Sequence, residues 1–480
     1  MSIGRHATKL SLATKAIYGT GIFADTVSST ALSTFLLFYL NAVCGLPGVL
    51  AGASLFVALF VDSFVDPLMG SISDNTTSAW GRRHGYMIIG LLPILLGLGL
   101  LFSLPKSLTG WPLFAYATGI ALVLRVGLSI YIVPYTALGA ELTDDYVERS
   151  AVVAWRMFFS VFATLVPLVL GYMVFLTNPY DHAAYIPFGW SCAVILVFFA
   201  GLAAFGTLGD RDRLHKATPN TDNPLPRLFR EIAEVFRNPS FRLLFTSVLV
   251  FFVAQGTAAA LGLHGSKFFW RLNNAQILTL ALATLVGVMA GIPFTALMGA
   301  RVEKKTMVIW SLVYIVITQG GLPLLRIWGF LPPNGSALMA ILIGNAVITG
   351  IAITFLTIGF QSMMADAADE HELLFGARRE GLYFAGLSFS TKAASGLGGF
   401  IAGIALDLIA FPADIAAKGG DKAHLTLSTV NDLGLVFGIV PAAMTFACVI
   451  FTIFYRIDRK AHADITAQLN ARRGQTGGTP

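Results

Sequence analysis

Apolar segments of similar length recur along the whole sequence, separated by shorter polar stretches. A helix needs about 20 apolar residues to cross the hydrocarbon core of a bilayer. Hydrophobic residues make up 56% of the chain and charged residues 12%, whereas soluble domains carry about 25% charged residues. We therefore expect an all-α polytopic membrane protein with twelve transmembrane helices. The expected spans are 17–41, 46–72, 86–104, 111–139, 155–176, 188–208, 241–263, 275–299, 306–326, 336–363, 383–411 and 432–455.

The twelve spans fall into two sets of six, separated by a charged, proline-containing stretch. We expect residues 1–208 to form one six-helix bundle, 209–240 a cytoplasmic linker, 241–456 a second bundle and 457–480 a cytoplasmic tail. A weak internal repeat supports this division, because spans two and eight end alike and the stretches after spans four and ten are also similar. Two related halves of this kind, with a solute site between them, are typical of the major facilitator fold.

Basic residues are concentrated in alternate loops. With the N-terminus placed inside, that side of the membrane carries 23 of the 32 Lys and Arg residues, and the opposite side carries 6. Cytoplasmic loops are enriched in Lys and Arg, so we expect a multi-pass protein of the cell (inner) membrane with both termini in the cytoplasm. The net charge of +6 then reflects orientation and does not indicate nucleic-acid binding.

The sequence contains no feature that indicates an enzyme. Cys44, Cys192 and Cys448 lack metal-like spacing, and their odd number argues against a disulfide framework. Metal-ligand clusters, nucleophile motifs and nucleotide-binding loops are also missing from the sequence. We therefore expect a non-enzymatic protein without a cofactor, whose partners are a small solute, a proton or monovalent cation, and the bilayer, and whose functional unit is a monomer.

Two aspartates, Asp62 and Asp66, lie inside the second span. Because they are four residues apart, both project from one face of the helix. An ionised group at mid-membrane costs roughly 2.5–3.5 kcal/mol on insertion scales, and two adjacent carboxylates repel each other in addition. A bound proton or Na⁺, or a nearby basic residue, relieves this cost. We interpret the pair as a coupling-cation site, with the alternative that Asp66, beside Pro67, has a structural role at a helix end.

Four further ionisable residues lie in or near the spans: Asp25, Arg125, Arg156 and Lys392. Arg125 is one turn from Ser129, so Arg125 can neutralise the acid pair or bind solute, and Ser129 can supply an oxygen ligand; an arginine reaching for the interface is the alternative. Lys392 lies among small residues and is a candidate solute ligand or ion-pair partner of the aspartates. Arg156, near the start of span five, is either a solute ligand or an interfacial anchor.

Five segments resemble the glycoside–pentoside–hexuronide:cation symporter family, which includes melibiose permease and lies within the major facilitator superfamily. The runs at 66–83 and 141–150 are the most specific, and the resemblance covers most of the chain. The segments are YGTGIF (18–23), VDSFVDPLMGSISDNTTSAWGRR (61–83), VPYTALGAELTDDYVERS (133–150), ADAADEHE (365–372) and REGLYFAGLSFSTK (379–392).

The resemblance implies roles for individual residues. Asp62 and Asp66 match the family's cation-site aspartates and would be metal ligands if the coupling ion is Na⁺. Ser129 stands where melibiose permease has a hydroxyl near that cation. Arg156 and Lys392 match basic residues at its sugar cavity.

The sequence also departs from the melibiose permease pattern. A Lys-Asp pair in span one becomes Asp25-Thr26, which makes these two residues candidates for solute binding. Val65 replaces an Asn beside the second aspartate and removes one oxygen ligand, which favours H⁺ over Na⁺. An Asp and two Trp of the sugar site become Ile132, Thr136 and Thr357 respectively.

These features predict a secondary transporter that couples H⁺ or Na⁺ to the symport of a sugar, glycoside, uronide or related organic solute by alternating access. The loss of acids and aromatic rings from the sugar site, with three basic residues present, leaves an alternative open. In that alternative the solute is a lipid-like, amphipathic or carboxylate compound, and its transport can be uncoupled.

Overall fold

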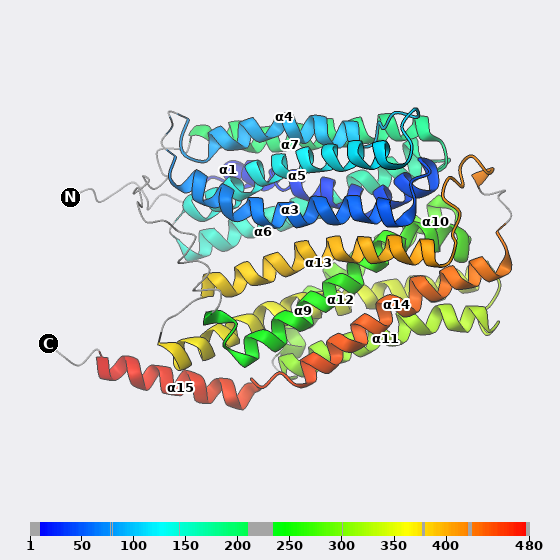
Figure 1. Cartoon of the computed structure of the whole chain (residues 1–480). Helices are drawn as coiled ribbons and strands as arrows, with labels where there is room; N and C mark the ends of the chain where they lie inside the picture. Colours follow the sequence, from blue (N-terminus) through cyan, green and yellow to red (C-terminus); the bar gives the residue numbers. More distant parts are fainter. Residues whose placement is uncertain are drawn as a thin grey trace.

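The computed structural model is almost entirely helical and describes residues 10–76, 78, 80–143, 145–209, 234–299, 301–376, 380–420 and 425–476. Within these ranges no strand occurs, and eleven helices are long and apolar enough to cross a membrane. A twelfth crossing is made by a segmented run at the start of the chain. The predicted all-α fold of twelve crossings in two sets of six is confirmed (Figure 1).

The first half begins with that segmented run, in which α1 and α2 are followed by two wider π-helical turns, η1 and η2. The sequence predicted one uninterrupted span at 17–41. The helix is interrupted at Gly21 and Ile22, whose N–H groups donate to carbonyls three residues earlier. A Cβ added at Gly21 would lie 2.4 Å from the ring of Tyr135, so only glycine permits this close approach. The elements of this half are α1 (Leu12–Thr20), α2 (Phe23–Ala31), η1 (Leu32–Leu36), η2 (Tyr39–Val43), α3 (Gly48–Asp74), α4 (His84–Leu101), α5 (Gly110–Glu141), α6 (Tyr146–Val169), η3 (Leu170–Phe175) and α7 (His182–Gly206).

The second half also has six crossings, followed by one further helix. The predicted tail at 457–480 contains this last helix, α15, which buries Ile465 and Leu469 against the second half. Most of the predicted linker at 209–240 lies outside the described residues. The elements of this half are α9 (Pro239–His264), η5 (Gly265–Phe269), α10 (Asn274–Gly299), α11 (Lys304–Ile327), α12 (Ser336–Phe375), α13 (Glu380–Leu408), α14 (Leu427–Ile453) and α15 (Arg459–Thr476).

α12 is longer than its predicted span, 336–363. Its 40 residues correspond to about 60 Å at 1.5 Å per residue, twice the thickness of a hydrocarbon core. The extra turns carry polar side chains, and among them Asp366 binds Lys304 of α11 at 2.9 Å and lies 3.5 Å from His462 of α15. The predicted span therefore marks the apolar part of the helix, and the polar extension holds α15 in place.

Two of the segments that carried the family resemblance meet in space. Arg82 and Arg83, which follow α3, both bind Glu141 at the end of α5. Arg83 also binds Asp74 in the last turn of α3. These ion pairs tie the ends of α3 and α5 together at the end of the molecule where both termini lie (Figure 1).

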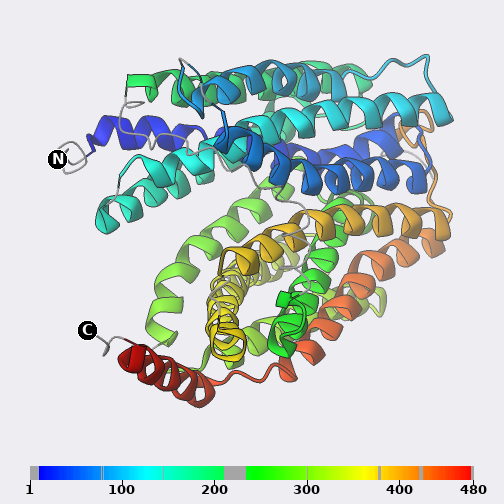
Figure 2. The same ribbon diagram turned by 60° about the vertical axis from the view of Figure 1, so that its left-hand side comes forward.

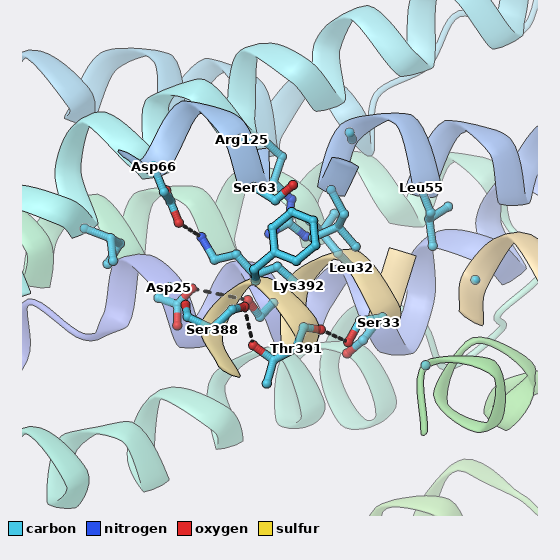
Figure 3. Close-up of a pocket in the computed structure, with 18 of the residues that line it drawn as sticks. Asp25, Leu32, Ser33, Leu55, Ser63, Asp66, Arg125, Ser388, Thr391 and Lys392 are labelled. Carbon is cyan, nitrogen blue, oxygen red and sulfur yellow. Dashed lines mark hydrogen bonds and ion pairs between the residues drawn. The ribbon is translucent and has the colours of Figure 1, made fainter. Parts of the chain in front are cut away.

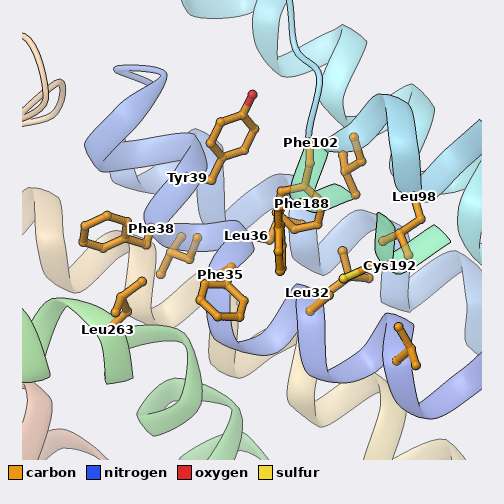
Figure 4. Packing of buried hydrophobic residues seen from close by; sticks show 14 of the residues in the cluster. Leu32, Phe35, Leu36, Phe38, Tyr39, Leu98, Phe102, Phe188, Cys192 and Leu263 are labelled. Atoms are coloured by element: carbon orange, nitrogen blue, oxygen red, sulfur yellow. The ribbon is translucent and has the colours of Figure 1, made fainter. Parts of the chain in front are cut away.

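The two halves form separate layers that converge at the end opposite the termini (Figures 1 and 2). A single apolar core joins them there. In Figure 4, Phe35 of the first crossing packs beside Phe188 of its own half, whereas Phe38 lies on the side of Leu263 of α9 and stacks on Phe268 of η5. This end is therefore sealed by side chains from both halves.

Polar contacts reinforce the seal. α3 begins at Gly48 without a side-chain cap of its own, and the Asp407 carboxylate of α13 accepts hydrogen bonds from the backbone N–H groups of Gly48 and Val49, both at 2.8 Å. In the loop after α13, Asp414 N–H donates to the Asn41 carbonyl at 3.0 Å. A helix of one half is thus capped by an acid from the other.

Candidate functional site

A cavity of about 1140 Å³ lies between the two halves. The first half lines it with residues of α2, η1, α3 and α5, and the second half with residues of α9 and α13. Its lining reaches Val235 and Phe236, next to the start of α9. The opposite end is sealed and the lining reaches Val235 and Phe236, so the cavity opens toward the end of the molecule that carries both termini.

The packing of α3 against α13 brings Lys392 to the acid pair. Lys392 Nζ lies 3.0 Å from Asp62 Oδ2 and also forms an ion pair with Asp66. Figure 3 shows Asp66 and Lys392 pointing toward each other across the cavity. Asp62 is only 1% exposed, whereas Asp66 and Lys392 line the cavity. An ammonium group from the second half therefore stands between two carboxylates of the first half.

The second oxygen of Asp62 is bound from α5. Ser129, also 1% exposed, donates a hydrogen bond to Asp62 Oδ1 at 2.7 Å. Arg125, one turn earlier on α5, has its Nη1 atom 3.9 Å from Asp62 Oδ2 and lines the cavity. The structure thus brings together Asp62, Asp66, Arg125, Ser129 and Lys392.

This arrangement can hold and exchange a single positive charge. Two adjacent carboxylates in a low-dielectric interior are stabilised by a positive charge between them, and in this conformation Lys392 supplies it. Asp66 Oδ1 is buried and has no hydrogen-bond partner among the described residues. A proton or a monovalent cation has the same charge as the ammonium group and can occupy these oxygens in its place.

The remaining candidates from the sequence lie in different places. Asp25 faces the cavity from α2, where Ser29 donates a hydrogen bond to it at 3.5 Å. Thr26 is not part of the cavity lining and is hydrogen-bonded to Ser160 of α6 at 3.3 Å. Arg156 is also outside the lining and interacts with the hydroxyl of Tyr18. Solute contacts by Thr26 and Arg156 remain a prediction, since in this conformation both residues face other side chains.

Several residues that line the cavity were not among the candidates predicted from the sequence. Gln255 of α9 is an amide within an apolar span, and that contrast is a signal that could have identified it. Ser388, Thr391 and Ser395 line the same cavity as Lys392. Ser388 and Ser395 are one helical turn from that lysine, and this spacing could have placed them beside it. Four phenylalanines on the second-half and linker side also line it; their type gives no signal in a membrane protein. They are Phe236, Phe241, Phe245 and Phe389.

Comparison with known proteins places this geometry in context. Residues 17–459 match the family described as MFS/sugar transport protein. An uncharacterized symporter of Synechocystis sp. is 25% identical over 98% of this chain and 99% of its own length. The isoprimeverose transporter of Lactiplantibacillus pentosus is 22% identical over 95% of this chain and 91% of its own. A glucuronide carrier protein homolog of Escherichia coli is 24% identical over 95% of both chains.

Solved structures show the same fold at low sequence identity. The nucleoside transporter NupG superposes with a TM-score of 0.62 at 12% identity, covering 93% of this chain and all of that one. A POT family transporter crystallised with 5-aminolevulinic acid gives a TM-score of 0.62 at 13% identity, covering 93% of this chain and 97% of its own. At such identities the likeness concerns the fold alone.

Proposed function

Because this chain belongs to the MFS/sugar transport protein family of membrane transporters, we propose that it carries a sugar-type organic solute together with H⁺ or Na⁺ by alternating access. It is a transporter and not an enzyme, and its curated relatives include named symporters. The names of these relatives do not tell which ion and which solute this chain carries.

The observation that carries the proposal is the contact of Lys392 with Asp62 and Asp66. Both aspartates belong to α3 of the first half, and the lysine belongs to α13 of the second. Asp66 and Lys392 also line the cavity. A cation or proton that reaches the carboxylates takes over the role of the ammonium group, which then becomes free to bind the solute. Binding of cation and solute is coupled through this exchange.

The conformation fits one state of an alternating-access cycle. The cavity faces the end that carries both termini, and the other end is sealed by contacts such as the Asp407 cap of α3. If both termini are cytoplasmic, as the distribution of basic residues predicts, this is the state open to the cytoplasm. The state open to the outside then requires separation of the sealed end.

Uptake into proteoliposomes tests the proposal. Purified protein is assayed with radiolabelled glycosides, pentosides and uronides under an imposed pH gradient or an inward Na⁺ gradient. We expect one gradient to drive accumulation of at least one solute, and Asp62→Asn to abolish accumulation while Asp414→Asn, a substitution of the same kind in an outer loop, preserves it. Solute accumulation that is the same with and without either gradient, and that is unchanged in Asp62→Asn, would overturn ion coupling.

A second candidate is the transport of an amphipathic, lipid-like or carboxylate solute. Four phenylalanines on the second-half and linker side of the cavity favour a solute with an apolar portion (Phe236, Phe241, Phe245 and Phe389). The same assay distinguishes this candidate, since an uncoupled carrier of such compounds would equilibrate them without a gradient and without Asp62.

A further inference from the structure

We propose that Arg125 binds a carboxylate group of the transported solute, so that the cargo is an acidic sugar derivative of the uronide type. The inference rests on the proposed function in one respect, that the solute occupies the cavity between the halves. It goes further by naming the charged group that the solute carries and the side chain that selects it.

Arg125 is a buried cation with unused hydrogen-bonding capacity. It lies near the middle of α5, is 9% exposed, and its exposed part faces the cavity. A guanidinium group has five N–H donors in a planar fork, and buried polar groups are nearly always hydrogen-bonded. Among the described residues, Arg125 makes no hydrogen bond, and its nearest carboxylate oxygen is 3.9 Å away. The fork therefore has no acceptor among the described protein groups.

The acid pair does not supply that acceptor. Asp62 Oδ1 accepts from Ser129 at 2.7 Å, and Asp62 Oδ2 is 3.0 Å from Lys392 Nζ. Asp66 is also paired with Lys392. Asp62 is thus engaged by closer donors, and Asp66 Oδ1, the oxygen of the pair without a hydrogen-bond partner among the described residues, forms no ion pair with Arg125. Arg125 adds only a longer-range attraction to the pair. Its donors remain available for a ligand that enters the cavity.

The geometry of the fork favours a carboxylate over a hydroxyl. Arginine binds a planar carboxylate through two parallel N–H···O bonds, and at depth in the membrane a charged partner compensates the cost of burying the guanidinium. Figure 3 shows Arg125 and Ser63 on one side of the cavity, with Ser33 and Thr391 on another. An acid group on Arg125 would place the remaining hydroxyls of a sugar near these polar side chains.

The charges around the cavity link this anion to the coupling ion. The site contains three acidic side chains and two basic ones, so the acids contribute one charge more than the bases. The acids are Asp25, Asp62 and Asp66, and the bases are Arg125 and Lys392. A solute carboxylate adds another. The cavity therefore binds the anion favourably only when a proton or cation is bound at the same time, because the added positive charge offsets the repulsion by the aspartates. Binding of an anionic solute thus favours symport with a cation.

The test compares matched ligands that differ only at the acid group. Thermal stabilisation and equilibrium binding are measured for pairs of uronides and neutral glycosides, such as phenyl glucuronide and phenyl glucoside, extended to galactose and xylose-type rings. We expect wild-type protein to bind at least one uronide roughly tenfold more tightly than its neutral partner, as befits a charge-assisted hydrogen bond. If no pair in the panel shows this preference, the proposal is wrong.

Variants assign the preference to Arg125. Arg125→Gln should lower the ratio of uronide to neutral-glycoside affinity about tenfold, whereas Arg125→Lys should retain part of the preference. Lys418→Gln removes an exposed positive charge outside the cavity and serves as the control. A preference that persists in Arg125→Gln contradicts the proposal, and if that variant does not fold, the wild-type comparison and Arg125→Lys still decide.

The outcome is separable from that of the proposed function. Ion-driven accumulation of a neutral glycoside that requires Asp62, without any preference for uronides, would overturn the role of Arg125 and leave symport standing. Loss of ion coupling together with an Arg125-dependent preference for uronides would do the opposite.

Discussion

Lys392 is the residue at which the two halves share a charge. It comes from α13, yet its ammonium group lies on the carboxylates of Asp62 and Asp66 in α3. In the proposed mechanism this lysine is an internal cation that a coupling ion has to displace. Such a site would bind ions less tightly than two bare carboxylates.

This competition predicts the effect of removing the lysine. In Lys392→Gln the carboxylates lose their internal cation, so we expect the apparent affinity for Na⁺ or Li⁺ to rise about tenfold, or about 1.4 kcal/mol. Lys392→Arg keeps the charge and should behave like the wild type. Thermal melting against increasing salt, with choline chloride to match ionic strength, measures the effect. A weaker response to Na⁺ in Lys392→Gln than in the wild type would contradict it.

The sequence indicated some of these relations and not others. Helical spacing alone puts Asp62 and Asp66 on one face, and Arg125 one turn from Ser129. That these two faces meet depends on how α3 packs against α5, which spacing does not determine. For the same reason, sequence resemblance suggested solute contacts for Thr26 and Arg156, whereas in this structure Thr26 faces α6 and Arg156 lies beside Tyr18.

At the scale of elements, α3 depends on α13 for its N-terminal cap. A carboxylate at a helix N-terminus is favoured by the helix dipole and by the unpaired N–H groups there. The Asp407 side chain fills this role across the boundary between the halves. Beside it, Gly48 and Gly403 approach so closely that a Cβ on Gly403 would lie 2.0 Å from the Gly48 carbonyl oxygen.

We predict that Asp407→Asn loosens the sealed end. An amide offers one acceptor oxygen and no charge, so the loss should be roughly 1 kcal/mol, which corresponds to about a fivefold increase in the open population. A cysteine at Ser33, which lines the cavity, reports opening through labelling by an impermeant thiol reagent added on the side opposite the termini. The native cysteines are replaced by alanine.

Asp414→Asn is the matched control for this experiment. Asp414 contacts the first half through its backbone N–H, which the substitution keeps, and Asn tolerates its positive φ of 65°. Labelling should therefore match the wild type. Equal labelling in Asp407→Asn and the control would show that the cap does not restrain opening.

Span positions were the most predictable property of the elements, because they follow from apolar length. The break at Gly21 and Ile22 was missed, since the span is continuously apolar there and the tighter hydrogen bonds that interrupt it leave no signal in hydropathy. The extension of α12 and the helical tail α15 were missed as well. Both consist of polar turns, which stabilise each other through contacts such as those of Asp366 with Lys304 and His462 and leave no hydropathy signal.

At the scale of the whole molecule, both termini lie at one end (Figures 1 and 2), and the lining of the cavity reaches toward that end at Val235 and Phe236. The division into six and six crossings could be predicted from the sequence because each span has its own apolar run. The relative placement of the halves could not, because it depends on the shared core and on contacts between residues hundreds of positions apart.

The orientation of the molecule in the membrane can be tested with two exposed lysines at opposite ends. Lys460 of α15 and Lys418 of the opposite end are both exposed. In a cysteine-free background, Lys460→Cys should react with an impermeant thiol reagent in inside-out vesicles, and Lys418→Cys in right-side-out vesicles or cells. The reverse pattern would show that the termini are external.

The apolar core that joins the halves at the sealed end has a consequence for leakage. Parting the halves there would wet side chains such as Phe38, Leu263 and Phe268, which are now buried, and each buried apolar side chain loses roughly 1.5–3 kcal/mol on exposure. In the proposed alternating-access cycle the unloaded protein must still open this end to take up solute, so the cost has to be offset by contacts that close the opposite end. Because one barrier forms as the other opens, ions would meet a closed barrier at every stage of the cycle.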